Sequence, residues 1–447
     1  MTAANRTPRT PEPPRQNVIS ESLNTRNMRR ILASSFTGSL IEYYDFLLYA
    51  TAAAIVFNQI FFTDMGPGFA AFASFGTLAA GYVARPLGGA VFGHFGDRVG
   101  RKNVLVVSML TMGVATCMIG LLPTTADIGV IAPVLLVLLR VVQGLAVGGE
   151  WGGAMLIALE HAPEKKRGFA ASFANMGAPA GAALATLVVS VFTLLPGDQF
   201  LSWGWRVPFL LSAVLVTVGL VIRLKVAETP LFQELQATAD AKKIPLVEVL
   251  TKNPKNLFLG IIAGTSVYSI AGIVTVWAVS YAVDSGADKT GVLNAKAAAA
   301  VVMVLTVILS ARLSDRFGRR PVMLAGVVGA AACAFPILWL VESGTVWGFT
   351  AAVVLGQGLQ GVIFGPFGAF TAELFPTRMR YTGASLAYQS ASTFGAGFTP
   401  AIASGLVLAA GGGLTLLGGL WILAFAAAAA AILLTREGRT RDLASMR

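Results

Sequence analysis

Four ionisable side chains lie inside long apolar segments, where such residues are rare. Glu42 and Asp45 are three residues apart in the stretch SLIEYYDFLLYATAAAIVF, so on a helix they share a face with an axial rise of about 4.5 Å between them. Arg85 and Arg140 lie in two later apolar segments. A charge at the centre of a bilayer costs about 2.5 kcal/mol or more. These four residues are therefore expected to have a chemical role or a partner.

The two carboxyls suit proton transfer. A carboxyl group inside a membrane can exchange a proton near neutral pH when its access alternates between the two sides. Asp45 is slightly preferred over Glu42 because it lies closer to the middle of its segment, and Glu150 is the third candidate. The alternative is structural: permanent ion pairs with Arg85 and Arg140 would balance two acids with two bases.

The two arginines suit binding of a carboxylate, because the guanidinium group is a planar fork of donors. Arg140 is favoured for a function in substrate binding or proton coupling, and Gln143 shares its helix face. Arg85, beside Pro86, Gly88 and Gly89, is equally compatible with substrate contact and with an ion pair to Glu42, Asp45 or Glu150.

The composition indicates an integral membrane protein made of helices. Of 447 residues, 55% are hydrophobic and only 12% are charged, and the mean hydropathy is +0.72, whereas a soluble protein carries about 25% charged residues. The apolar segments are long and unbroken rather than short and alternating, which favours helices over a barrel.

The net charge of +11 reports membrane topology and not a nucleic-acid partner. Among the 33 Lys and Arg residues, Arg206, Lys289 and Lys296 are assigned to one side of the membrane and Arg85 and Arg140 to spans. All the others fall on the opposite side. This bias predicts that the more basic side, with both termini, is cytoplasmic.

Apolar runs of about 20 residues predict twelve spans in two sets of six. Their approximate limits are 31–60, 70–95, 103–122, 131–158, 168–195, 205–223, 256–283, 294–312, 321–341, 346–372, 381–408 and 413–434. The predicted organisation is a disordered cytoplasmic tail (1–30), a six-helix bundle (31–223), a cytoplasmic linker (224–255), a second six-helix bundle (256–434) and a short cytoplasmic tail (435–447).

The two halves repeat a pair of motifs. DRVGRK (97–102) follows the second span and DRFGRR (315–320) follows the eighth, while E-x-x-P-x-x-x-R ends the fourth span at 160–167 and the tenth at 373–380. GHFGDRVGRKNVL (93–105) resembles the signature loop of the major facilitator superfamily. With IEYYDFLLYA, ARPLGGAVFG and RVVQGLAVGGEWGGA, the chain from 28 to 435 is similar to the metabolite:proton symporter group of that superfamily.

The resemblance implies twelve helices in two bundles that open a central cavity alternately to each side. It further implies proton-coupled import of a small organic acid such as shikimate, a dicarboxylate or an aromatic acid. A proline/betaine-type zwitterion symporter is one alternative, although residues 435–447 are too short for the coiled coil that some osmolyte transporters carry. Proton-driven export of drugs or metabolites is another, because NMGAPAGAAL (175–184) partly resembles an exporter motif.

The polar residues of the spans are assigned to two further groups. Substrate contacts are expected from Arg140, Arg85, Gln143, Tyr44, Tyr268, Gln357, Gln360, Tyr388 and Gln389. A loop and gate on the cytoplasmic side are expected from Gly93, Asp97, Arg98, Gly100, Arg101, Lys102, Glu160, Arg167, Asp315, Arg319, Glu373 and Arg380. In that gate Asp97 and Arg101 are predicted to pair with Glu160 and Arg167, and Gly93, Gly96 and Gly100 to permit the tight turn.

The sequence argues against other classes of protein. It has no nucleophile–base pair, no ATP-binding G-x-x-x-x-G-K-[ST] loop and no metal-ligand spacing, so we expect neither an enzyme nor a bound cofactor. Cys117 and Cys333 each lie among apolar neighbours, where a thiol behaves as a small hydrophobic group. The expected partners are a small organic anion or zwitterion, a proton and the lipid bilayer, without nucleic acid.

Overall fold

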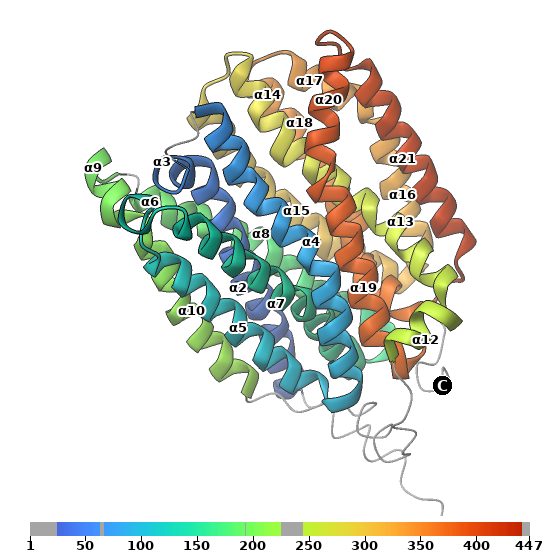
Figure 1. The fold of residues 1–447 in the computed structure, drawn as a ribbon. Coiled ribbons are helices and arrows are strands. Elements are labelled where there is room, and N and C mark those ends of the chain that lie inside the picture. Colours follow the sequence, from blue (N-terminus) through green and yellow to red (C-terminus); the bar gives the residue numbers. More distant parts are fainter. Residues whose placement is uncertain (1–24, 63–66, 193, 225–244, 440–447) are drawn as a thin grey trace, which may run out of the picture.

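The computed structural model describes residues 25–62, 67–192, 194–224 and 245–439, and within these ranges the regular structure is entirely helical (Figure 1). The first half contains α2 (Thr25–Ala52), η1 (Ala53–Phe57), α3 (Asn58–Ile60), α4 (Pro67–Val99), α5 (Arg101–Leu121), α6 (Thr125–Ile128), α7 (Ile131–His161), η3 (Glu164–Lys166), α8 (Arg167–Phe192), α9 (Gly197–Gln199), η4 (Phe200–Gly204) and α10 (Arg206–Leu224).

The second half contains α12 (Pro245–Lys252), α13 (Pro254–Ile270), η5 (Ala271–Trp277), α14 (Ala278–Asp284), α15 (Lys289–Phe317), α16 (Arg319–Ala332), α17 (Ala334–Glu342), α18 (Val346–Glu373), η6 (Thr377–Met379), α19 (Arg380–Ser392), η7 (Thr393–Gly397), α20 (Thr399–Ala409) and α21 (Thr415–Leu434). Residues 225–244 of the predicted linker lie outside the described residues, but its last part forms the short helix α12 and not a loop.

The helices account for the twelve predicted spans. Nine helices of the described part are long and apolar enough to cross a membrane, and the bent pair α16–α17 makes a tenth. The remaining two spans are formed by α2 with its short continuations and by α4, which carry the charged residues Glu42, Asp45 and Arg85. The prediction of an all-helical membrane protein is confirmed.

The ninth span is not the single straight helix that its apolar run predicted. α16 and α17 meet at Cys333 with a bend of 45°. Pro336 explains the position of this break, because proline has no N–H to donate to the carbonyl of Ala332 and its ring crowds that carbonyl. Among the described residues π-helical segments occur at η1, η4, η5 and η7. η5 contains Gly272 and η7 contains Gly395 and Gly397, and such segments are frequent at functional sites.

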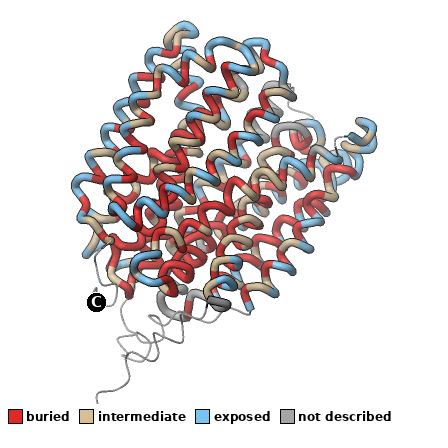
Figure 2. The backbone as a smooth tube through the Cα atoms, turned by 180° about the vertical axis from the view of Figure 1, so that it is seen from behind, coloured by how far each residue is buried: buried red, intermediate tan, exposed pale blue. Residues whose placement is uncertain are grey.

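The two halves form neighbouring groups of helices that meet along α4 with α19 and along α8 with α15 and α18 (Figure 1). Buried residues run through the interior of the tube in Figure 2, whereas exposed residues lie on the outer helices. Many of those exposed residues are large and apolar, such as Val107 and Val114 on α5, as expected of a surface that contacts lipid.

Small residues set the spacing between α4 and α7. A Cβ atom at Gly144 would collide with the backbone at Gly81, and one at Gly148 would collide with the backbone at Arg85 and Gly89. Gly144 and Gly148 therefore form a small-residue face on α7 that permits this close approach. This close approach positions Arg85 beside the middle of α7.

Only one of the three glycines predicted to form the first signature turn does so. Gly100 has φ of 115° between α4 and α5, and Gly318 has φ of 107° at the equivalent place between α15 and α16, a region that disfavours other residues. Gly93 and Gly96 instead lie inside α4. Gly93 permits contact between the two halves, because a Cβ atom there would lie 2.7 Å from the Cα of Thr382.

Candidate functional site

Arg85 lies where the two halves of the protein meet. Its Nε donates a hydrogen bond to Oε1 of Gln389 on α19 at 2.8 Å, and its Nη2 is 3.8 Å from Oε1 of Glu42. Arg85 and Glu42 are only 3% and 2% exposed. Within the described part of the chain, neither carboxylate oxygen of Glu42 nor Nη2 of Arg85 has a hydrogen-bond partner. The junction thus keeps buried donors and acceptors free for a polar solute.

Aromatic side chains line the same junction. The hydroxyls of Tyr43 on α2 and Tyr388 on α19 are 2.6 Å apart. The ring of Trp151 stacks on that of Tyr388 with centroids 3.4 Å apart, and Tyr268 meets Tyr388 edge to face at 5.4 Å. These four side chains come from α2, α7, α13 and α19. They form an amphipathic wall that suits a small solute with both polar and apolar faces.

A second polar network lies wholly within the first half. The carboxylate of Asp45 accepts hydrogen bonds from Oγ1 of Thr116 at 3.0 Å and from the hydroxyl of Ser212. Nε2 of Gln143 donates to Oγ1 of Thr116 at 2.7 Å, and Nη1 of Arg140 donates to Oε1 of Gln143 at 3.2 Å. Asp45 and Arg140 are fully buried and are joined through an amide and a hydroxyl.

No ion pair of Arg140 with Glu42, Asp45 or Glu150, which was the structural alternative to a functional role, occurs among the described residues. The guanidinium carbon of Arg140 lies 4.1 Å from the ring centroid of Phe46 and 4.2 Å from that of Tyr49, so aromatic faces take the place of a carboxylate. The alternative of two balanced ion pairs is thus wrong for this conformation: Glu42 approaches Arg85, but Asp45 contacts hydroxyl groups.

Glu150 is paired elsewhere. It forms an ion pair with Arg223 at the end of α10 and accepts a hydrogen bond from Oγ of Ser108 at 3.0 Å. Arg223 also donates to the carbonyl of Leu105 at 3.0 Å. This buried pair ties α5, α7 and α10 together and leaves Glu150 with a cationic partner, unlike Asp45.

Of three other predicted substrate contacts, one lies inside the first half and two lie on α18 of the second half. The hydroxyl of Tyr44 donates to the carbonyl of Pro208 at 2.9 Å inside the first half, so Tyr44 packs within its own bundle and not at the junction. Gln357 and Gln360 on α18 are each 5% exposed. Oε1 of Gln357 has no hydrogen-bond partner among the described residues and is available to a solute.

Charged residues join the halves at the end of the molecule that carries the signature loops. Nη1 of Arg380 is 3.3 Å from Oε1 of Glu160 across the two halves. Asp315 accepts hydrogen bonds from the backbone N–H groups of Gly168 and Phe169, both at 2.8 Å, at the N-terminus of α8, where a carboxylate is favoured. These contacts are called the latch below.

Arg319 of the second signature motif binds the latch residue Asp315 and a neighbouring carboxylate, all within the second half. Nη1 of Arg319 donates to Oδ1 of Asp315 at 2.7 Å, and its Nη2 is 3.2 Å from Oε1 of Glu373. Arg319 is fully buried. It therefore holds Asp315 in position for α8 and joins the loop to the end of α18.

The side chains of the first signature motif are mostly outside the described residues, namely those of Asp97, Arg98 and Arg101. Nζ of Lys102 donates to the carbonyl of Leu224 at 2.9 Å. The pairing of Asp97 and Arg101 with Glu160 and Arg167 stays a prediction.

Sequence reasoning did not assign several residues that the structure brings into these networks, and four of them illustrate why. They are Tyr43, Thr116, Ser212 and Arg223. Tyr43 stands next to Glu42, which was a usable signal. Thr116 and Ser212 are single hydroxyls within apolar runs, where the hydropathy pattern barely registers them. Arg223 lies at a span end, where an arginine is ordinarily read as a topology marker.

Comparison with known proteins agrees with this architecture. The profile of the Major Facilitator Superfamily matches residues 35–400 and 297–443. The chain is 43% identical over 441 residues to the inner membrane metabolite transport protein YhjE of Escherichia coli K12, covering 94% of this chain and 96% of that protein. It is 40% identical over 392 residues to the shikimate transporter of the same organism, covering 86% and 89%.

A more distant relative is the proline/betaine transporter of Salmonella typhimurium LT2, which is 32% identical over 394 residues and covers 85% of this chain and 78% of that protein. The fold is similar to that of the proton:xylose symporter XylE bound to 6-bromo-6-deoxy-D-glucose, with a TM-score of 0.76, 18% identity and coverage of 95% and 99%. The chain belongs to the Major Facilitator Superfamily and is a membrane transporter, not an enzyme.

Proposed function

We propose that this transporter imports a small organic acid together with a proton, by alternating access. The observation that carries the proposal is the position of Arg85, a buried guanidinium at the junction of the halves. Its Nη2 has no hydrogen-bond partner among the described residues and only a long ion pair of 3.8 Å to Glu42, and its Nε donates a hydrogen bond to Gln389 of the other half. A carboxylate of the solute would accept from the free edge of this fork. The similarity to a shikimate transporter favours the same class of solute.

Binding at this place would link the solute to the movement of the halves. Arg85 belongs to α4 and Gln389 to α19, and Nε2 of Gln389 also donates to the carbonyl of Val147 on α7 at 3.1 Å. A solute that competes for Arg85 would change the contacts that hold the two halves together. Tyr43 and Tyr388 would contact the remainder of the solute.

Asp45 is the proposed proton site. Its partners are hydroxyl groups, and among the described residues no Lys or Arg lies within ion-pair distance of it. A carboxylate buried without a counter-charge is costly, so Asp45 would hold a proton in this conformation and release it when access changes. Release of the proton from Asp45 would alter the hydrogen bonds of Thr116 and Gln143 and, through them, the contacts of Arg140.

The latch side is proposed to be cytoplasmic, in agreement with the positive charge of its loops. The latch contacts then close the cytoplasmic end in this conformation, and import requires them to break. Arg380, Glu160 and Asp315 would act on the rate of this conformational change, because they lie away from Arg85 and its neighbours.

The test is uptake into proteoliposomes that contain the purified protein. With a more acidic outside, labelled shikimate and a panel of dicarboxylates and aromatic acids are offered in turn. The proposal expects accumulation of at least one acid that disappears when a protonophore removes the pH gradient. Accumulation that ignores the pH gradient, or efflux driven by it, would contradict proton-coupled import.

A zwitterion such as proline or a betaine is the second candidate. Trp151, Tyr268 and Tyr388 form an aromatic cluster at the junction, and aromatic rings are the side chains that bind quaternary ammonium groups by cation–π contact. Proline/betaine transporters are also among the relatives. Adding glycine betaine and proline to the same panel decides between the two classes.

A further inference from the structure

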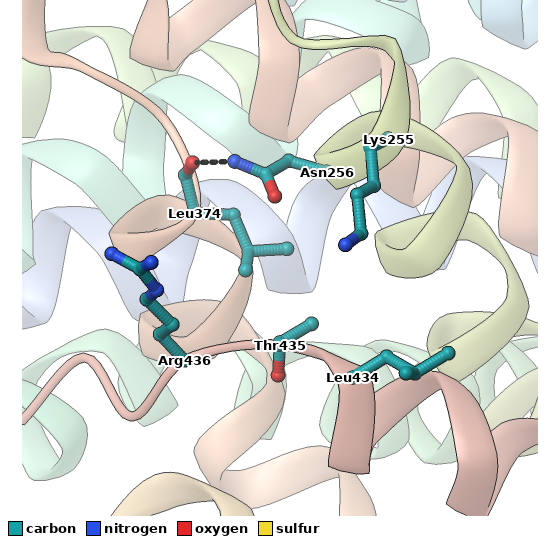
Figure 3. Close-up of a pocket in the computed structure, with 6 residues that line it drawn as sticks. All are labelled: Lys255, Asn256, Leu374, Leu434, Thr435 and Arg436. Carbon is teal, nitrogen blue, oxygen red and sulfur yellow. Dashed lines mark hydrogen bonds between the residues drawn. The ribbon is translucent and has the colours of Figure 1, made fainter.

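A cavity of about 300 Å³ lies at the latch end of the second half, separate from the junction of the halves. It is lined by Lys255 and Asn256 at the start of α13, Leu374 after α18, and Leu434, Thr435 and Arg436 at the end of α21 (Figure 3). In Figure 3 the amine of Lys255 points into the space, and Arg436 lies on the opposite side, beyond the side chain of Leu374 in this view. We propose that this cavity binds the phosphate group of an anionic phospholipid from the membrane leaflet on the latch side.

Charge is the first reason. Lys255 and Arg436 are cations without an ion pair among the described residues, and no acidic side chain lines the cavity. The nearby acids are already engaged: Glu437 accepts from the backbone N–H groups of Arg319 and Arg320 at 3.0 Å, and Glu373 binds Arg319. The cavity therefore presents two cationic side chains that form no ion pair among the described residues.

The N-terminus of α13 further favours an anion in this cavity. The cavity lies at the N-terminus of α13, a helix of 17 residues, where the helix dipole and the backbone N–H groups of the first turn favour an anion. Nδ2 of Asn256 is already used, because it donates to the carbonyl of Leu374 at 2.9 Å. That bond fixes the first turn of α13 against the end of α18 and gives the cavity a rigid wall.

The apolar surroundings distinguish a lipid from a soluble phosphate. Leu434 on the rim is 64% exposed, and so is Phe258 on α13, one turn after Lys255 and on the same helix face. In a transmembrane protein such exposed side chains face the acyl chains. A phosphodiester held by Lys255 and Arg436 would thus continue into chains lying over Phe258 and Leu434. Basic pockets between membrane helices on the cytoplasmic side suit anionic headgroups for this reason.

The test measures lipid binding to the full chain by native mass spectrometry, with phosphatidylglycerol, phosphatidylcholine and inorganic phosphate titrated separately. The double variant Lys255→Gln/Arg436→Gln removes both cations. A matched control, Lys165→Gln/Lys166→Gln, removes the same charge from exposed residues of the loop after α7. At about a five-fold effect for each cation near the surface, the cavity variant is expected to bind phosphatidylglycerol roughly thirty-fold more weakly, while the control changes by less than three-fold.

The design separates the possible sources of the phosphate. Preferential binding of phosphatidylglycerol over phosphatidylcholine, lost only in the cavity variant, supports the proposal. If inorganic phosphate binds equally well and competes fully with phosphatidylglycerol, the ligand is the soluble ion and the lipid assignment is wrong. If phosphatidylglycerol binding falls equally in the cavity variant and the control, or falls in neither, the cavity is not the binding site and the proposal is wrong. Melting temperatures of both variants verify that the fold is intact.

Discussion

Replacing Arg85 with lysine tests which of the two buried arginines holds the solute. Lysine keeps the positive charge but loses the planar fork, together with the 2.8 Å bond from Nε to Gln389. A hydrogen bond between charged groups contributes about 1.5–3 kcal/mol. If the carboxylate of the solute takes two such bonds from Arg85 and the lysine supplies one, the loss is about 2 kcal/mol, or a roughly thirty-fold higher Kd.

Arg140→Lys is the matched control, since it makes the same change on a neighbouring helix. Arg140 lies between the rings of Phe46 and Tyr49 and donates to Gln143 of its own helix, so its substitution should lower the melting temperature. The Kd for the solute should change by less than about three-fold. The corresponding change in binding free energy is well under the roughly 1.4 kcal/mol that a ten-fold change in Kd requires.

The assay is equilibrium binding to purified protein, using whichever acid drives uptake in the proteoliposome panel. The reasoning fails if Arg140→Lys raises the Kd thirty-fold while Arg85→Lys binds normally. In that case the carboxylate would be held inside the first half, as the sequence alone suggested.

Three further changes test the latch, the helix packing and the topology. Asp315→Asn weakens two hydrogen bonds to the start of α8, so turnover in transport assays should fall several-fold with little change in Kd; lost binding by a folded variant would refute a gating role. Gly148→Val places a side chain against the backbone of α4 and should lower the melting temperature by several degrees, whereas Gly405→Ala, with open space around it, should not. A cysteine at Asp198 or Asp288 should react with an impermeant thiol reagent only from outside the cell, and reaction only from inside would invert the topology.

The sequence was sufficient for the fold because membrane helices follow from local properties. Hydropathy located the spans, and Pro336 carried a signal for the bend in the ninth span that the apolar run concealed. The extent of α4 was underestimated, because glycine in the sequence indicates a turn as readily as a close helix contact, and Gly93 serves the contact.

The partners of the buried charges could not be predicted in the same way. Tyr43 and Tyr388 are 345 residues apart, and no local pattern states that α2 and α19 present them to each other. Arg140 illustrates the difficulty most clearly: its depth in the membrane was evident, but the orientation that directs it to Phe46 and Tyr49 follows from the packing of α7 on α2 and α4. The sequence therefore identified which buried residues are charged, but it did not predict which side chains contact them.

The central claim is that Asp45 carries the coupled proton, and one comparison tests it most directly. Asp45→Asn cannot release a proton, so accumulation of substrate against its gradient should be abolished, while exchange of labelled for unlabelled substrate continues at a rate close to that of the unaltered protein. Glu42→Gln should retain proton-driven accumulation, although its solute affinity can change because Glu42 lies 3.8 Å from Arg85. Melting temperatures of both variants exclude unfolding as the cause. Proton-dependent accumulation by a folded Asp45→Asn protein would contradict the account.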